Sequence, residues 1–123
     1  MPYSIEWDKK VVRCTFSGNV SGKELIDCNM SIYGNPNFDD IRLRIFDMLN
    51  VTEISFNRDD VIIVAAYDRA ATKVNPRVKC ALVSADQVFY KLSDVYQNEN
   101  IDSPWDSKTF HTLSEALEWG CPY

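Results

Sequence analysis

The side chains that could support catalysis or metal binding are few in this sequence and widely spaced. Nucleophilic catalysis needs a serine or cysteine beside a base, and His111 is the only histidine. The four cysteines lie at no metal-binding or redox spacing, so the sequence predicts no metal site and no cofactor. The acidic pairs at 39–40 and 59–60 stand in loops or at helix starts, where capping accounts for them. We therefore predict that the protein is not an enzyme.

Length and composition predict a single globular domain over residues 1–123. Hydrophobic residues make up 46% of the chain, which is enough to build one core at this length. The formal net charge is −5 and the basic residues are scattered, so nucleic acid is not an expected partner. The N-terminus lacks the stretches of a signal peptide, and no apolar run approaches the ~18 residues that span a bilayer. We expect a cytoplasmic protein.

Apolar periodicity predicts where the strands lie. Alternating residues over 3–7 and 12–16 indicate an N-terminal antiparallel hairpin. Residues 43–49 and 78–83 have apolar side chains at both odd and even positions, as in parallel strands that are covered on both faces. A short last strand is expected at 107–110.

Capping signals predict four helices between and after these strands. Their expected extents are Ser21 to Tyr33, Asn57 to about Val74, a start near Asp86, and Thr112 to Gly120. The resulting order is ββαβαβαβα. It predicts an α/β fold with one mixed sheet, in which an antiparallel hairpin precedes parallel strands and about four helices cover the sheet.

Six short segments, spread over nearly the whole chain, carry a resemblance to known proteins. They are Tyr33-Gly-Asn-Pro-Asn-Phe-Asp-Asp40, Ile45-Phe-Asp-Met48, Ala66-Tyr-Asp-Arg-Ala-Ala71, Asn75-Pro-Arg77, Ser103-Pro-Trp105, and Phe110 through Ala116-Leu-Glu-Trp119. Through them the chain resembles the SpoIIAA-like (STAS-related) family of bacterial proteins. The resemblance implies a SpoIIAA-like fold, and no enzymatic activity follows from it. It also implies CRAL-TRIO lipid-binding domains as neighbours in fold.

The resemblance brings with it a phosphorylation motif that this chain does not reproduce. The anti-sigma factor antagonists carry Asp-Ser between the third strand and the following helix. This chain has Glu53-Ile-Ser-Phe-Asn-Arg-Asp59 there, so Ser55 lacks the preceding aspartate. The carboxylates of Asp59 and Asp60 at the helix start would also repel an added phosphate. We do not expect a serine switch.

Two polar residues interrupt predicted apolar faces. Asp47 lies inside a buried strand, and Asn29 lies in the apolar stripe of the first helix. A buried polar group needs a partner, so one interpretation is that both side chains bond to nearby backbone groups. The alternative is that they are polar anchors in a ligand pocket, to which Tyr33, Asp68 and Tyr96 would also contribute.

The middle helix predicts an interaction surface. In Val61-Ile-Ile-Val64, apolar side chains point in every direction, and Ile62 is expected to lie among the charges of Arg58 and Arg69. With Phe56 and the aromatic residues of the third helix, it would form an exposed apolar patch. Such a patch would contact a second subunit, a lipid-like ligand or a membrane surface.

Two hypotheses of function follow. The first is a non-enzymatic binding or regulatory module that acts through protein–protein contacts, with a homo-oligomer as its simplest form. The alternative is binding of an apolar small molecule or lipid, with peripheral membrane association. An enzyme is a third hypothesis, and it would need Tyr33, Asp47, Asp68, Arg69 and Tyr96 to converge.

Trp105 is expected to be a structural lid. Pro104 fixes the chain just before it, and a large aromatic residue in a polar loop is seldom left in water. We predict that the indole folds back over the end of the third helix, near Val95 or Tyr96.

Overall fold

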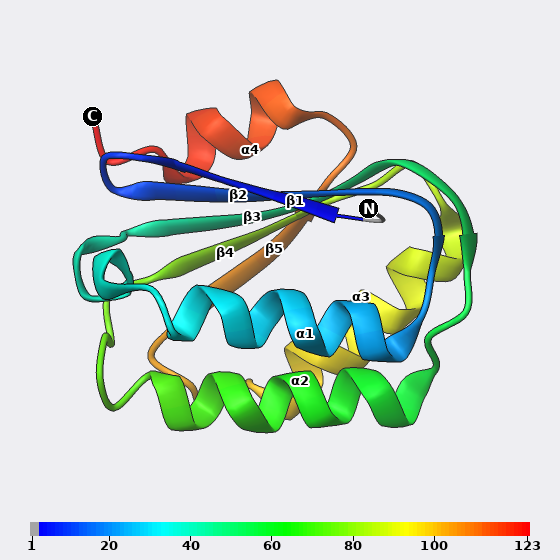
Figure 1. Cartoon of the computed structure of the whole chain (residues 1–123), viewed down its shortest axis with the longest axis horizontal. Coiled ribbons are helices and arrows are strands. Elements are labelled where there is room, and N and C mark those ends of the chain that lie inside the picture. Colours follow the sequence, from blue (N-terminus) through cyan, green and yellow to red (C-terminus); the bar gives the residue numbers. More distant parts are fainter. Residues whose placement is uncertain (1–2) are drawn as a thin grey trace.

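The computed structural model describes residues 3–123 and contains one mixed sheet of five strands (Figure 1). Strands β1 (Tyr3–Asp8) and β2 (Val11–Val20) form the antiparallel hairpin. Strands β3 (Leu43–Ile54), β4 (Lys79–Val83) and β5 (Asp106–Phe110) follow in parallel, β3 beside β2. The strands lie in sequence order from β1 to β5, so each pairs with its neighbour in the chain.

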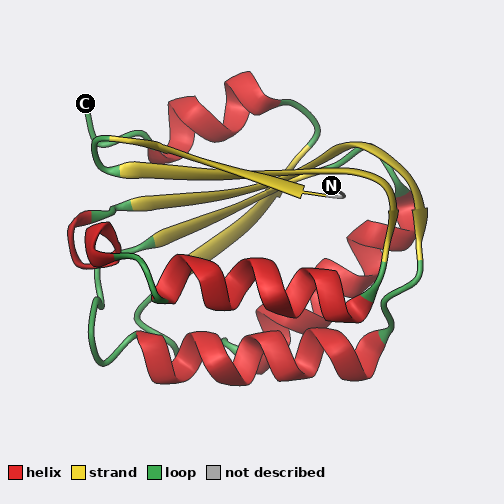
Figure 2. Ribbon diagram, viewed as in Figure 1, coloured by secondary structure: helices red, strands yellow, loops and turns green. Residues whose placement is uncertain are grey.

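Helices cover both faces of the sheet, unequally (Figure 2). One face carries α1 (Gly22–Tyr33), α2 (Arg58–Ala71) and α3 (Gln87–Glu99), and the other carries only α4 (Leu113–Gly120). A 3₁₀ turn, η1 (Pro36–Asp40), links α1 to β3. The predicted order ββαβαβαβα and the predicted mixed sheet are confirmed.

Helices α1 and α2 begin at the N-caps that were predicted from the sequence. Ser21 and Glu24 bond reciprocally at the start of α1, and Asn57 and Asp60 do the same at the start of α2. The ends of α1 and α4 agree with the prediction, whereas the ends of α2, α3 and β3 differ. α2 stops at Ala71, α3 continues to Glu99 through part of the expected loop, and β3 runs on to Ile54 because the end of β2 pairs with it.

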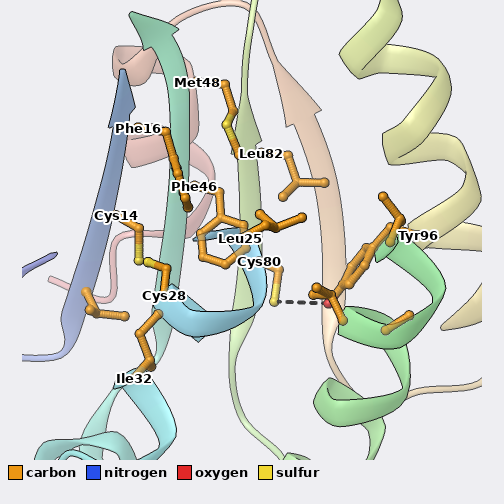
Figure 3. Packing of buried hydrophobic residues seen from close by; sticks show 14 of the residues in the cluster. Cys14, Phe16, Leu25, Cys28, Ile32, Phe46, Met48, Cys80, Leu82 and Tyr96 are labelled. Carbon is orange, nitrogen blue, oxygen red and sulfur yellow. Dashed lines mark hydrogen bonds between the residues drawn. The ribbon is translucent and has the colours of Figure 1, made fainter. Parts of the chain in front are cut away.

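The core divides into two parts because both faces of the sheet are covered. The larger part lies beneath α1, α2 and α3 and includes Phe16 and Phe46, whose rings meet edge to face with centroids 5.6 Å apart (Figure 3). The smaller part lies beneath α4 and contains Leu43 and Ile45. Burial on both sides explains why β3 and β4 are apolar on both parities. Cys14, Cys28 and Cys80 are buried free thiols, as predicted.

Trp105 is buried, as predicted, and it borders the end of α3 at Gln97 and Asn98 as well as the loop after α2. Its Nε1 donates to the carbonyl oxygen of Asn75 at 2.6 Å, and its ring packs against Phe38 with centroids 6.2 Å apart. The expected contact was the end of α3, near Val95 or Tyr96. A buried indole N–H needs an acceptor, and the loop after α2 supplies one in the carbonyl of Asn75.

We predict that Trp105→Ala lowers the free energy of unfolding by about 3–5 kcal/mol, because a large buried side chain is lost. Trp105→Phe keeps an aromatic ring but removes the bond to Asn75, which adds about 1 kcal/mol to its packing loss. Urea unfolding measures both. Ile101→Ala is the control, since Ile101 is 76% exposed and its loss should stay below about 0.5 kcal/mol. Equal losses from Trp105→Ala and Ile101→Ala would contradict the structural role.

Candidate functional site

A buried ion pair joins the central strand to the middle helix. Arg44 of β3 and Asp68 of α2 are each about 1% exposed. Arg44 donates from Nη1 to Oδ1 of Asp68 at 2.9 Å and from Nη2 to Oδ2 at 2.8 Å. This two-point contact is the strongest geometry an arginine and a carboxylate can adopt. It holds α2 at one position and one rotation over the sheet.

Three further side chains complete the network from the flanking helices. Asn29 of α1 donates to Oδ1 of Asp68 at 3.0 Å and accepts from Nη1 of Arg44 at 2.9 Å. Tyr33 of α1 also donates to Oδ1 of Asp68. Tyr96 of α3 donates to Oδ2 at 2.5 Å. The network therefore ties α1, α2 and α3 to β3 through one carboxylate.

Aromatic rings flank the arginine. The guanidinium carbon of Arg44 lies 4.5 Å from the ring centroid of Phe46 and 5.3 Å from that of Trp105. The lid formed by Trp105 thus also packs against this charge. These ring faces stabilise a cation that is cut off from water.

Burial changes the protonation behaviour of these groups. It raises the pKa of the Asp68 carboxyl, while the hydrogen bonds from Tyr96 and Asn29 favour the charged form. Burial alone would lower the pKa of the Arg44 guanidinium, but Cys80 and Tyr96 leave that pKa raised, so Arg44 stays a cation. Burial also raises the pKa of Cys80 to about 11, which keeps it a thiol beside the Tyr96 hydroxyl (Figure 3).

Within residues 3–123, no buried side-chain nitrogen or oxygen of this network lacks a hydrogen-bond partner. Among the described residues, the buried side-chain nitrogen without a hydrogen-bond partner is Nε of Arg13, which lies outside this network. The Cys80 thiol is protonated, and the thiolate is the nucleophilic form. This arrangement positions the helices against the sheet.

Four of the five predicted ligand-site residues meet here. Asn29, Tyr33, Asp68 and Tyr96 converge on one carboxylate, although the first and the last of them lie far apart in the chain. The prediction that Asn29 bonds to backbone groups is wrong, because its partners are side chains.

Asp47 lies on the opposite face of the sheet and takes no part in the network. It accepts from the backbone N–H of Leu49 at 3.0 Å, which confirms the backbone interpretation, and from Nη2 of Arg13 at 2.8 Å. The opposite parity of positions 44 and 47 in β3 accounts for the separation, because alternate residues of a strand face opposite sides.

Arg44, the centre of the network, is the residue that sequence reasoning missed. The signal was present: Arg44 and Asp47 are the two charged residues of a run, 43–49, that is otherwise apolar on both faces of the strand. A charge in a strand covered on both faces requires a buried counter-charge. Asp68, in the only helix between β3 and β4, could have been matched to it on that ground.

A small apolar cavity lies beside Arg44 and Tyr96, between the sheet and the helices. Its volume is about 30 Å³, and its lining includes Met48, Phe56 and Leu82. Pockets for small molecules have volumes of roughly 300–1,000 Å³. The cavity has room for about one or two waters, but its lining offers them almost no polar partners.

The outer face of α2 is the second feature that the network positions. With Asp68 directed at the sheet, Ile63 and Tyr67 point outward and are 43% and 42% exposed. Ala66 and Ala70, also exposed, lie on the same face. α2 lies between α1 and α3, at the edge of the molecule farthest from α4 (Figure 2).

Two of the interface residues predicted from sequence, Phe56 and Ile62, are more buried than expected. Phe56 is only 4% exposed and packs against Phe89 with ring centroids 6.5 Å apart, so it is not part of a surface patch. Ile62 is half-buried, and its neighbour Ile63 is the more exposed of the two. Phe56 precedes α2 and is buried by its contact with Phe89, whereas Ile62 and Ile63 differ because successive helical residues point about 100° apart.

The two predicted arginines of this surface are both exposed. Arg58 opens α2, and Arg69 lies near its end. Arg69 donates from Nη1 to the carbonyl oxygen of Glu99 and to Oδ1 of Asn100, each at 3.1 Å. It therefore fixes the end of α2 to the end of α3.

The carboxyl ends of the strands carry no catalytic arrangement among the described residues. Ser55 is exposed, and its hydroxyl lies 2.5 Å from Oδ1 of Asn19. Nδ1 of His111 meets the Tyr90 hydroxyl at 2.9 Å. Within residues 3–123 no three His, Cys, Asp or Glu side chains gather closely enough to hold a metal ion. No helix in that range has the length and apolar character to cross a membrane.

Solved structures share this architecture at low sequence identity. The unphosphorylated anti-sigma factor antagonist SpoIIAA matches 95% of this chain and 96% of its own, with a TM-score of 0.63 and 14% identity. An anti-sigma factor antagonist from Mycobacterium paratuberculosis covers 95% of this chain and 91% of its own, with a TM-score of 0.63 and 15% identity. The chain has the SpoIIAA-like fold.

A further structure extends the comparison beyond the antagonists. An uncharacterized DUF3478 protein with a SpoIIAA-like fold from Shewanella loihica PV-4 covers 97% of this chain and 92% of its own, with a TM-score of 0.52 and 15% identity. No protein-family model matches the sequence, and no curated protein does. The fold predicted through the family resemblance is confirmed by these structures.

We predict that Asp68→Asn lowers the free energy of unfolding by about 3–5 kcal/mol, because it leaves Arg44 buried without its counter-charge. Asp27→Asn is the matched control. Asp27 pairs with Lys23 at the surface, and such pairs contribute about 0–1 kcal/mol. Urea unfolding followed by circular dichroism measures both variants.

Tyr96→Phe tests the same network if Asp68→Asn does not fold. It removes one hydrogen bond to a charged group, and we expect a loss of about 1.5–3 kcal/mol. Losses from Asp68→Asn and Tyr96→Phe no larger than that from Asp27→Asn would show that the network does not hold the helices.

Proposed function

We propose that this protein is a non-enzymatic regulatory module that binds another protein through the outer face of α2. One observation carries the proposal: the solvent side of α2 is apolar over its middle two turns, where Ile63 and Tyr67 lie with Ala66 and Ala70. The solvent face of a surface helix is ordinarily charged or polar. An apolar stretch rimmed by charges is typical of a protein-binding site.

The fold and the buried network support this proposal. Two proteins with the same fold are named as anti-sigma factor antagonists, so the fold is compatible with action on another protein. The polar groups beneath α2 are used in holding the helices. A rigid helix with a fixed outward face suits recognition, because little conformational freedom is lost on binding.

The test is affinity capture from cells with the tagged full chain. It compares two variants that each replace an exposed isoleucine with glutamate. Ile63→Glu places a charge in the proposed surface, and Ile101→Glu places one at an exposed position outside it. We expect one protein to be retained in a fixed ratio by the wild type and by Ile101→Glu, and to be lost with Ile63→Glu. Retention by all three, or by none, would contradict the proposal.

A second candidate function is binding of an apolar small molecule, and the apolar cavity beside Tyr96 is the observation that favours it. A ligand larger than a water would require Phe56 and Phe89, which line this cavity and contact each other, to move apart. Native mass spectrometry of freshly isolated protein would then show a mass above that of the chain. A mass equal to that of the chain alone would exclude a retained ligand.

A further inference from the structure

We propose that the segment of the partner that binds the α2 face is an acidic amphipathic helix, which lies along α2 and over its border with α1. The inference rests on the proposed function, because it uses the same surface and names the chemistry of its occupant. Three features of the surface carry it. They are an apolar side next to α1, small side chains along the middle, and a row of cations next to α3.

The apolar side of this surface extends from α2 onto α1. The two helices run side by side in the same direction (Figure 1). Gly22 of α1 packs against Asp60 of α2 so closely that a Cβ at position 22 would overlap the carboxylate. The residues one and two turns after Gly22 are Ile26 and Met30, so they border α2 as well. Ile26 is half-buried, and Met30 is 43% exposed.

On α2, large apolar side chains line the same border and small ones lie beside them. Ile63 and Tyr67 follow Asp60 by three and seven positions, so they share the side of α2 that meets α1. Ala66 and Ala70 are exposed on the side that faces away from the sheet. Such small side chains let the axis of a packed helix approach to about 8 Å. A helix laid here would meet alanines beneath it and large apolar side chains along one flank.

Cations line the other flank of α2, next to α3. Arg69 marks this side, because its guanidinium donates to the carbonyl oxygen of Glu99 and to the side chain of Asn100, which are uncharged acceptors. Arg58 lies three turns earlier on the same side, and Lys73 stands four residues after Arg69, in the turn that follows α2. All three cations are exposed. A helix bound along α2 is therefore favoured if it carries carboxylates on this flank.

Three carboxylates stand near these cations without pairing with them. Asp59 lies in the first turn of α2, where it faces the positive end of the helix dipole. Glu99 and Asp102 line a surface cavity together with Arg69. The ion pairs formed within residues 3–123 include none of the three cations of α2 and the turn after it. Their charges therefore stay open to carboxylates of a partner.

A helix fits this surface better than an extended segment does. An extended peptide binds by adding backbone hydrogen bonds to a free strand edge, and helices such as α1 and α2 bond their backbone groups internally. A bound helix satisfies its own backbone and presents side chains every three to four residues. That spacing matches Ile63 with Tyr67 on α2, and Ile26 with Met30 on α1.

Photo-cross-linking in cells identifies the occupant. The photoreactive amino acid p-benzoylphenylalanine replaces Tyr67 in the tagged full chain, and it replaces Ile101, which is exposed outside this surface, in the control. We expect position 67, and not position 101, to cross-link to a segment of another protein. Mass spectrometry of that segment should show apolar residues at helical spacing with Asp or Glu beside them. A basic segment, or a segment of this chain itself, would overturn the inference.

The cross-linked segment, made as a synthetic peptide, tests the role of the cations. We expect Lys73→Glu to weaken peptide binding about tenfold or more in fluorescence anisotropy, because a carboxylate then meets the acidic flank. Lys10→Glu makes the same change at an exposed position in the turn between β1 and β2, and should leave the affinity unchanged. Added salt should weaken binding to the wild type. Equal affinities of the wild type and Lys73→Glu would overturn the acidic partner.

The outcomes separate this inference from the proposed function. If position 67 cross-links a protein whose peptide binds the wild type and Lys73→Glu equally, the regulatory module stands and the acidic helix fails. If position 67 cross-links no protein and affinity capture retains none, both fail. Sedimentation of the chain with vesicles of phosphatidylserine and phosphatidylcholine that is lost with Lys73→Glu would show a membrane surface as the occupant and overturn the inference.

Discussion

The buried pair of Arg44 and Asp68 is the interaction on which the rest of this structure depends. Two charges taken out of water are costly unless each finds a partner in good geometry. Here the two-point contact, with bonds to the carboxylate from Asn29, Tyr33 and Tyr96, meets that need. Satisfying it fixes one arrangement of β3 against all three helices of this face. The ion pair therefore fixes how the helices lie on β3 more than it adds to the free energy of unfolding.

The position of α2 is the consequence that matters for function. Asp68 must face the sheet, so the residues half a turn away must face solvent. These include Ala66 and Ile63. The inner and outer sides of α2 are thus linked: a polar group on the inside determines which apolar side chains are presented outside. A binding surface on such a helix is preorganised by the core.

Much of the fold followed from local signals in the sequence. The caps at Ser21 and Asn57 act within a few residues, and the alternation of apolar side chains along each strand reflects its own burial. For the candidate site, Asn29 was recognised because a polar group in an apolar stripe is costly to bury, and Asp68 was named only as a further contributor to the same pocket. Their convergence was not predictable from spacing, because contacts between residues far apart in the chain depend on how the helices pack.

The sequence by itself determined the element order, the mixed sheet and the two-sided burial of β3, because periodicity and capping depend on near neighbours. Only the tertiary structure decided that Phe56 turns inward and Ile63 outward, and that Asp47 lies on the opposite face from Asp68. Successive helical residues differ by about 100° in direction, so a small rotation of α2 exchanges buried and exposed positions. That rotation is set by a bond between Arg44 and Asp68, which are distant in sequence and meet only in the folded chain.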